Sequence, residues 1–282
     1  MTNAPIVPHL LDRCDEAVLA AEGLLIAAKD SVAEMVTENG KISAKAVDRE
    51  QRAAHGLAWY ATYVEALRQM ARWARALDGE GKFGEIEQLI LQAAFGEYLA
   101  QLAGGIAMSQ NEIARPYNLG LSNEVIGEFW SPAVDELAQL GTRAEVRAGI
   151  ADYLAKHEGA MFVGDPGLDD TMAMIREQFF RFAQEKVTPF AHQWHLKDEL
   201  IPLEVISELS ELGVFGLTIP EQFGGAGLSK TAMCVVSEEL SRGYIGVGSL
   251  ATRSEIAAEL ILTGATKDQR DYWLPNIASG EK

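Results

Sequence analysis

Apolar residues recur at helical spacing along most of the chain. Between Ser43 and about Asp78 they step by three and four residues, which is the repeat of an amphipathic helix. The first stripe consists of Leu57, Tyr60, Val64, Leu67, Ala71 and Ala74. A second stripe on another face consists of Trp59, Tyr63, Ala66, Met70 and Trp73. Because a helix with two apolar faces usually lies between neighbours, we expect this helix to be sandwiched in a bundle.

Two further helices are predicted around this one. An earlier helix covers Asp12 to Val36 and stops near Asn39-Gly40, a pair typical of a helix C-terminus. A later helix runs from Gly84 to about Arg115. Its apolar stripe is Phe95, Leu99, Leu102 and Ile106, and its small residues are Gly96, Ala103, Gly104 and Gly105. The small residues would let another helix approach closely, although each glycine costs about 1 kcal/mol of helix propensity.

Three helix starts are marked by capping residues. Ser131-Pro132 places a capping side chain before a proline at the first helical position. The segments starting at Thr142 and Thr266 match the capping box, in which two side chains satisfy two unpaired amides. No segment alternates convincingly with period two, so we expect no sheet in this chain. The fold class predicted is all-α.

The strongest break in the helical pattern lies between Gly159 and Gly167, where three glycines and a proline occur. Such a cluster ends one helical region before the next begins at Asp169. We therefore expect an N-terminal helical extension over residues 1–160 and a second helical domain over residues 161–282.

The composition limits the possible partners. The chain has 282 residues, 24 Lys plus Arg against 41 Asp plus Glu, and a net charge of -17. Nucleic acids and anionic membranes are poor partners for such a surface, because phosphate binding depends on Lys and Arg. There is no apolar run long enough to span a bilayer and no secretory signal pattern. Cys14 and Cys234 lack CxxC spacing and are expected to be buried small residues in a reducing cytoplasm.

Two residue clusters suggest chemistry but have simpler explanations. Gly224, Gly225 and Gly227 form a tight loop, but neither the dinucleotide-binding nor the P-loop motif is present, so we expect a structural loop. His192 and His195 lie three residues apart with acidic residues behind them, and no third cluster completes a metal site. No metal is expected.

The segments after Asp169 resemble a known family when they are taken in order. They read MIREQFFRFAQEKVTPFAHQW, IPLEVISELSELGVFGLTIPEQFGGAGLS, CVVSEELSRG and GATKDQRDYWLPNIASGEK. Over about 115 residues this order is similar to the N-terminal helical domain of the acyl-CoA dehydrogenases. IPEQFGGAGL is the most specific element, whereas SEEL alone is weak.

The resemblance implies a flavin enzyme of which this chain is one part. Members oxidise an acyl-CoA to the 2,3-enoyl-CoA: a carboxylate removes the α-proton and the β-hydride passes to FAD. An electron-transfer flavoprotein is the implied acceptor. In the family the β-barrel domain follows the IASGE motif and the C-terminal helical domain follows that. We therefore expect the catalytic base and most of the flavin site beyond Lys282, no catalytic residue within this chain, and no activity of the chain by itself.

In the resembling family, the helix after SEEL lines the far end of the acyl chain. Here that helix carries Ser249, Thr252 and Arg253. Arg253 would form a bidentate pair with a distal carboxylate, and the two hydroxyls would donate hydrogen bonds to it. This implies a short dicarboxylyl-CoA substrate. The alternative is that Arg253 is a solvated residue paired with Glu255 or Glu259.

The extension in front of Asp169 sharpens the resemblance, because most family members lack it. It is similar to a subgroup that combines a long helical extension with a short dicarboxylyl substrate, in the ethylmalonyl-CoA route of acetate assimilation. We expect the extension to cover a surface that most relatives use for tetramer assembly, which would leave a homodimer. Two alternatives stay open: an acyl-CoA dehydrogenase for another short, branched or aryl acyl-CoA, and a non-catalytic α-helical interaction module.

Overall fold

The computed structural model describes residues 6–158 and 162–282. It divides into two compact units, Met1–Gly167 (unit 1) and Leu168–Lys282 (unit 2). The predicted domain boundary at residues 160 and 161 falls in 159–161, outside the described residues, and stays a prediction. Both units consist mainly of helices, which confirms the predicted all-α class. No helix in the described ranges is long and apolar enough to cross a membrane.

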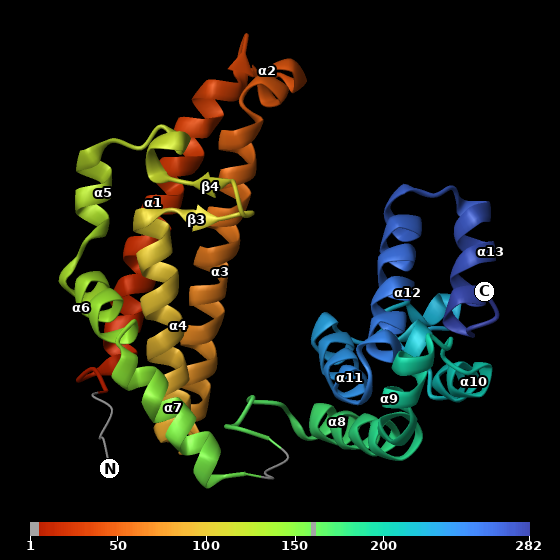
Figure 1. Ribbon diagram of the computed structural model, residues 1–282. Helices are drawn as coiled ribbons and strands as arrows, with labels where there is room; N and C mark the ends of the chain where they lie inside the picture. The colour runs from red at the N-terminus through yellow and green to blue at the C-terminus, as the bar shows by residue number, and fades with distance from the viewer. Residues whose placement is uncertain (1–5, 159–161) are drawn as a thin grey trace. The chain divides into compact units, whose positions relative to one another are not determined.

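Unit 1 is a bundle built on α1 (Leu10–Val36), α3 (Gln51–Gly79) and α4 (Glu85–Gly104), which run side by side (Figure 1). Its other elements are α2 (Ala44–Arg49), β1 (Thr37–Glu38), β2 (Lys41–Ile42), β3 (Ile106–Ala107), β4 (Ile113–Ala114), η1 (Pro116–Leu119), α5 (Asn123–Phe129), α6 (Pro132–Gly141) and α7 (Ala144–Lys156). The first apolar stripe of α3 is buried except at half-buried Leu57, and the second stripe is half-buried. The first stripe packs in the core of the bundle, as the sequence predicted, whereas the second stripe packs against that core and stays partly exposed.

The expectation that the chain contains no sheet is wrong at two short hairpins. Strands β1 and β2 pair antiparallel, and so do β3 and β4, with two residues in each strand. Asn39 and Gly40 connect β1 to β2 with φ values of +52° and +75°, so they form a hairpin turn instead of the predicted helix cap. An Asn-Gly pair favours this turn because both positions require positive φ.

Three predicted helix boundaries also need correction. The helix expected to run to Arg115 ends at Gly104, because Gly105 adopts a φ of +127° and leads into β3. The long helix expected from Ser43 is broken at Glu50 into α2 and α3. The capping box predicted at Thr142 does not form, since α7 begins without a side-chain cap and the Thr142 hydroxyl donates to the carbonyl of Ala138.

Other sequence signals are confirmed. Ser131 caps α6 with Pro132 at the first helical position, and Thr266 and Gln269 form the predicted capping box. Gly96 of α4 lies against α6, where a β-carbon would come within 2.8 Å of the Gly141 backbone. A side chain at position 96 would therefore push the two helices apart.

Unit 2 consists of helices and short helical turns around a separate core. Its elements are α8 (Asp170–Phe182), the π-helical turn η2 (Ala183–Val187), α9 (Thr188–Lys197), α10 (Leu203–Glu211), η3 (Val214–Gly216), η4 (Glu221–Phe223), α11 (Lys230–Gly243), α12 (Ile245–Gly264) and α13 (Lys267–Ala278). Helix α8 contributes Phe179 and Phe182 to this core, and α10 contributes Val205 and Leu209. Figure 1 shows α12 and α13 joined as a helical hairpin.

Candidate substrate-binding face

Helix α12 is held against α11 by a buried stripe and a close glycine contact. The buried apolar residues of α12 are Val247, Ala251 and Ala258, spaced at helical intervals. Gly248 lies beside them, and a β-carbon at this position would come within 2.7 Å of the backbone nitrogen of Ser241. Position 248 must therefore stay glycine for α11 and α12 to approach this closely.

The three residues predicted to bind substrate lie on one side of α12. Ser249 and Thr252 are three residues apart and Arg253 follows by one, so their side chains share a face of the helix. The Ser249 hydroxyl donates to the carbonyl of Gly246 at 2.9 Å, and the Thr252 hydroxyl lies 3.4 Å from that of Ser237 on α11. Both hydroxyls are half-buried, whereas Arg253 is exposed. That this face binds substrate stays a prediction.

Arg253 has an unpaired guanidinium as far as the described residues go. The alternative pairing with Glu255 or Glu259 is not seen, because both carboxylates bind Lys230 instead. The exposed side chains of Ile256 and Leu260 continue the Arg253 face along the helix, with 56% and 69% of their surface accessible. Arg253, Ile256 and Leu260 thus form an exposed strip of α12 that carries a cation at one end.

A charged cluster that the sequence analysis missed lies on the opposite side of α12. The carboxylate of Glu255 is buried, accepts a hydrogen bond from the Thr218 hydroxyl and binds the ammonium group of Lys230. Lys230 also binds Glu259, one turn further along α12. These bonds raise the pKa of Lys230, first through Glu255 and then through Glu259. In the sequence, this cluster is indicated only by two acidic residues, Glu255 and Glu259, that lie four positions apart on a mainly apolar helix.

The SEEL motif supplies a second buried carboxylate. Glu239 is 1% exposed and binds the guanidinium of Arg176 at 3.0 Å. Arg242 approaches Glu239 from the next turn of α11 at 3.3 Å, and its guanidinium lies 5.5 Å from the centre of the Phe180 ring. Since Arg176 and Phe180 belong to α8, this network joins α8 to α11. Glu239 therefore has a structural role in unit 2.

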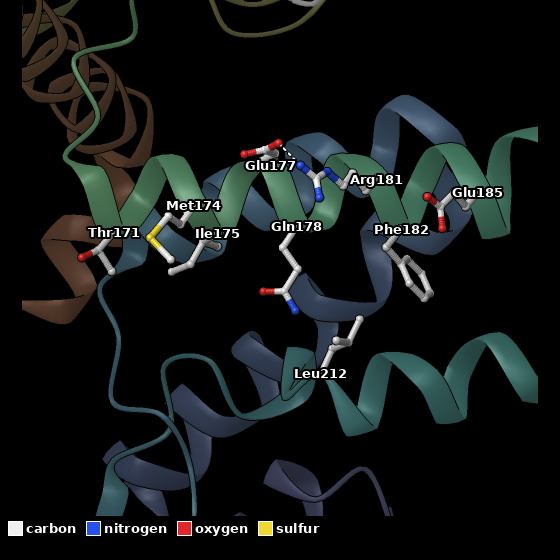
Figure 2. A pocket seen from close by; sticks show the side chains of 9 residues that line it. All are labelled: Thr171, Met174, Ile175, Glu177, Gln178, Arg181, Phe182, Glu185 and Leu212. Carbon is white, nitrogen blue, oxygen red and sulfur yellow. Dashed lines mark hydrogen bonds and ion pairs between the residues drawn. The ribbon is translucent and has the colours of Figure 1, made fainter.

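An open groove of about 770 Å³ lies along α8. Figure 2 shows Gln178 of α8 and Leu212, at the end of α10, pointing toward one another across it. The Glu177–Arg181 ion pair belongs to its lining. The remaining lining residues are Thr171, Met174, Ile175, Phe182 and Glu185. The lining thus mixes apolar and charged side chains, and none of the predicted site residues belongs to it.

A smaller groove of about 510 Å³ lies where η4 meets the α12–α13 hairpin. Its lining residues are Gln222, Phe223, Leu262, Lys267, Arg270 and Asp271. The Lys267 ammonium binds Asp271, and the Arg270 guanidinium donates to the carbonyl of Leu262. Both cations of this groove therefore already bind other groups of the chain. Arg253 is not among its lining residues.

The glycine-rich loop does not fit the phosphates of a flavin dinucleotide. The backbone amides of Ala226, Gly227 and Leu228 donate to carbonyls of residues 216–219 at 2.8–2.9 Å. A β-carbon on Gly225 would overlap the carbonyl of Ile219. Because these amides are used to close the loop, they are not available to an anion. The loop has the structural role expected from the sequence, and no step of the chemistry is assigned to it.

The remaining candidates show no organised site. His192 and His195 are both exposed, and within residues 6–158 and 162–282 no group of three His, Cys, Asp or Glu side chains could hold a metal ion. Cys14 is buried, whereas Cys234 is exposed, so the expectation of two buried thiols is wrong for Cys234. Cys234 lies on the exposed face of α11.

Comparison with known proteins identifies unit 2. Residues 169–281 match the family described as acyl-CoA dehydrogenase, N-terminal domain. The chain is 55% identical over 281 residues to a (2S)-methylsuccinyl-CoA dehydrogenase of Cereibacter sphaeroides, which covers 100% of this chain and 50% of that protein. This alignment includes both units.

Other relatives align with unit 2 alone. An isobutyryl-CoA dehydrogenase of Dictyostelium discoideum is 34% identical over 116 residues, which are 41% of this chain and 28% of that protein. A glutaryl-CoA dehydrogenase of Desulfococcus multivorans is 30% identical over 125 residues, 42% of this chain and 31% of that protein. The chain thus spans half or less of the length of these relatives. Residues 169–281 therefore belong to the family of acyl-CoA dehydrogenase N-terminal domains.

Proposed function

We propose that this chain is part of a flavin-dependent acyl-CoA dehydrogenase that oxidises (2S)-methylsuccinyl-CoA to mesaconyl-CoA. The observation that carries the proposal is the likeness to a (2S)-methylsuccinyl-CoA dehydrogenase through both units, at 55% identity. The other two relatives described above align over about 120 residues only. Among these three relatives, the methylsuccinyl-CoA enzyme is the one whose alignment includes unit 1, and this supports methylsuccinyl-CoA as the substrate.

The chemistry that this chain contributes is recognition of the acyl group. The full reaction removes an α-proton and a β-hydride from the acyl thioester, and the FAD cofactor supplies the redox step when bound. No residue of this chain is assigned as the base. Arg253 is the residue that we assign to the distal carboxylate of methylsuccinyl-CoA, with Ser249 and Thr252 as hydroxyl donors, because its guanidinium is exposed and unpaired among the described residues.

The test uses the full-length protein and follows flavin absorbance after mixing with methylsuccinyl-CoA or butyryl-CoA. We expect rapid bleaching with methylsuccinyl-CoA and much slower bleaching with butyryl-CoA. In Arg253→Ala, loss of a charge-assisted pair costs about 1.5–3 kcal/mol, so KM for methylsuccinyl-CoA should rise roughly 10- to 150-fold. Bleaching with butyryl-CoA alone would favour the alternative, an acyl-CoA dehydrogenase for another short or branched acyl group. A protein without flavin that responds to neither would favour the helical interaction module.

The assembly and location complete the proposal. We infer a cytoplasmic homodimer that passes electrons to an electron-transfer flavoprotein. The half-buried second stripe of α3 supports further association, because Trp59, Tyr63 and Trp73 keep apolar surface that another protein surface would cover. Light scattering on the full-length protein should give the mass of a dimer, and a tetramer would contradict this assembly. Reduction of purified electron-transfer flavoprotein on adding substrate tests the acceptor.

A further inference from the structure

Glu255 connects α12 to both ends of the glycine-rich loop. One carboxylate oxygen accepts a hydrogen bond from Thr218, just before the loop, and the other binds Lys230, just after it. Lys230 also binds Glu259 on the next turn of α12. Glu255 lies on the buried stripe of the helix with 9% of its surface exposed. The carboxylate is therefore bound from two separate segments of the chain.

The loop that holds Glu255 is itself fixed by backbone hydrogen bonds. Leu228 donates to Leu217 at 2.8 Å and Gly227 donates to Ile219 at 2.9 Å, so the two arms of the loop are paired. Thr218 lies between the paired residues, and Lys230 begins α11 next to Ser229, whose side chain caps the helix. These bonds and the helix start hold the backbone of both partners of Glu255 in place.

This anchor determines which face of α12 is exposed. Successive residues of an α-helix are rotated by about 100°, so residues two apart lie on nearly opposite sides. Glu255 points into unit 2, and Arg253 consequently points outward on the face that continues through Ile256 and Leu260. Lys230 also occupies both carboxylates of α12, which leaves neither of them to pair with Arg253. Rotation of α12 about its axis by a few tens of degrees would turn the guanidinium of Arg253 away from its present outward direction.

We propose that Glu255, held by Lys230 and Thr218, is a positioning residue that orients Arg253 toward the distal carboxylate of the acyl group. The inference rests on the proposed function, because it requires Arg253 to read that carboxylate. Glu255 touches no substrate atom in this scheme. It acts by fixing the rotation of α12 about its axis. It also keeps Lys230 bound to the carboxylates of α12, so that these do not pair with Arg253.

The experiment measures steady-state kinetics of full-length variants with methylsuccinyl-CoA and with butyryl-CoA. Glu255→Gln keeps the shape and the contact with Thr218 but removes the ion pair with Lys230. We expect KM for methylsuccinyl-CoA to rise about tenfold, with kcat and the butyryl-CoA parameters unchanged. Lys230→Met should have the same effect, whereas Lys230→Arg should restore the wild-type KM because it keeps the cation.

A double variant separates positioning from general damage. In the Arg253→Ala background, Glu255→Gln should add no further increase in KM, because the residue that it orients is already gone. Lys186→Gln is the matched control, since it breaks a Lys–Glu pair of the same unit, with Glu208, on surface-exposed side chains. It should leave all parameters unchanged. If Glu255→Gln does not fold, Lys230→Met tests the same anchor from its exposed end.

The outcomes distinguish the two levels of the proposal. If Arg253→Ala itself leaves KM for methylsuccinyl-CoA unchanged, the proposed role of Arg253 is wrong. If Arg253→Ala raises KM but Glu255→Gln and Lys230→Met do not, only the positioning role fails. Equal losses with both substrates, or additive effects in the double variant, would make the anchor a purely structural feature and overturn the inference.

Discussion

Replacing Glu239 by glutamine should weaken the joint between α8 and α11. The carboxylate is 1% exposed and faces Arg176, whose side chain is 14% exposed, and Arg242, whose side chain is 36% exposed. Glutamine has the same shape but carries no charge, so the guanidinium of Arg176 would lose this ion pair in a nearly buried position. Arg242 can turn toward water because it is already partly exposed.

These exposures determine the size of the effect. Removing one partner of a buried ion pair costs about 3–5 kcal/mol, since the other charge is left uncompensated. The glutamine oxygen still accepts one hydrogen bond, and Arg242 can rehydrate. We therefore expect a smaller loss, about 2–3 kcal/mol, from the free energy of opening unit 2. This corresponds to a decrease of roughly 30-fold or more in the protection of buried amides.

Hydrogen exchange of the amides in α8 and α11 is the suitable assay, because it reports on unit 2 separately from unit 1. Glu238→Gln is the matched control: Glu238 is the neighbouring residue of the same motif and its side chain is exposed. Its effect should stay within about 0.5 kcal/mol. Equal protection in Glu239→Gln and Glu238→Gln would refute the reasoning, and so would a loss confined to the amides of unit 1.

Two further predictions concern unit 1 and the thiols. Tyr60→Phe removes a hydroxyl that donates to the carbonyl of Leu102 at 2.7 Å, so opening of unit 1 should become easier by about 1–2 kcal/mol in hydrogen exchange. Tyr63→Phe loses only a partly buried hydrogen bond to the Gln101 side chain, so it should change the free energy of opening by less than about 0.5 kcal/mol. Equal effects of the two tyrosine variants would contradict this account. Burial raises the pKa of the Cys14 thiol, so its reactive thiolate is scarce at neutral pH, whereas Cys234 is exposed. A thiol reagent should label one equivalent quickly and the second only after unfolding; rapid labelling of both would contradict the burial of Cys14.

The helices were predictable because their apolar spacing repeats over many turns. The stripe through Tyr60 and Leu67 and the stripe through Phe95 and Leu99 are buried as the pattern requires. The errors occur where one or two residues decide the backbone. At Gly105 a positive φ ends α4, and at Asn39 and Gly40 the same property makes a hairpin turn. Periodicity contains no information about such positions, because it averages over several residues.

The candidate site was only partly predictable for a different reason. The identity and spacing of Ser249, Thr252 and Arg253 place them on one face of a helix, and this follows from sequence alone. The anchor of Glu255 depends on contacts 25 and 37 residues away, with Lys230 and Thr218. No local pattern reveals which of several lysines will meet a given glutamate, so this cluster required the tertiary structure.

The most specific motif of the chain reports on its fold and not on its chemistry. IPEQFGGAGL requires glycine because the backbone adopts positive φ at Gly224 and Gly227, and because the carbonyl of Ile219 occupies the space of a side chain at Gly225. These constraints hold for any substrate, since the amides of the loop are used internally. Differences in substrate must therefore arise from positions that the backbone leaves free to vary. On α12 those positions include Ser249, Thr252 and Arg253, whereas Gly248 and the anchored Glu255 keep the helix in place. A fixed helix with a variable exposed face would allow one fold to accept different acyl groups, and the Arg253→Ala and Glu255→Gln variants separate these two contributions.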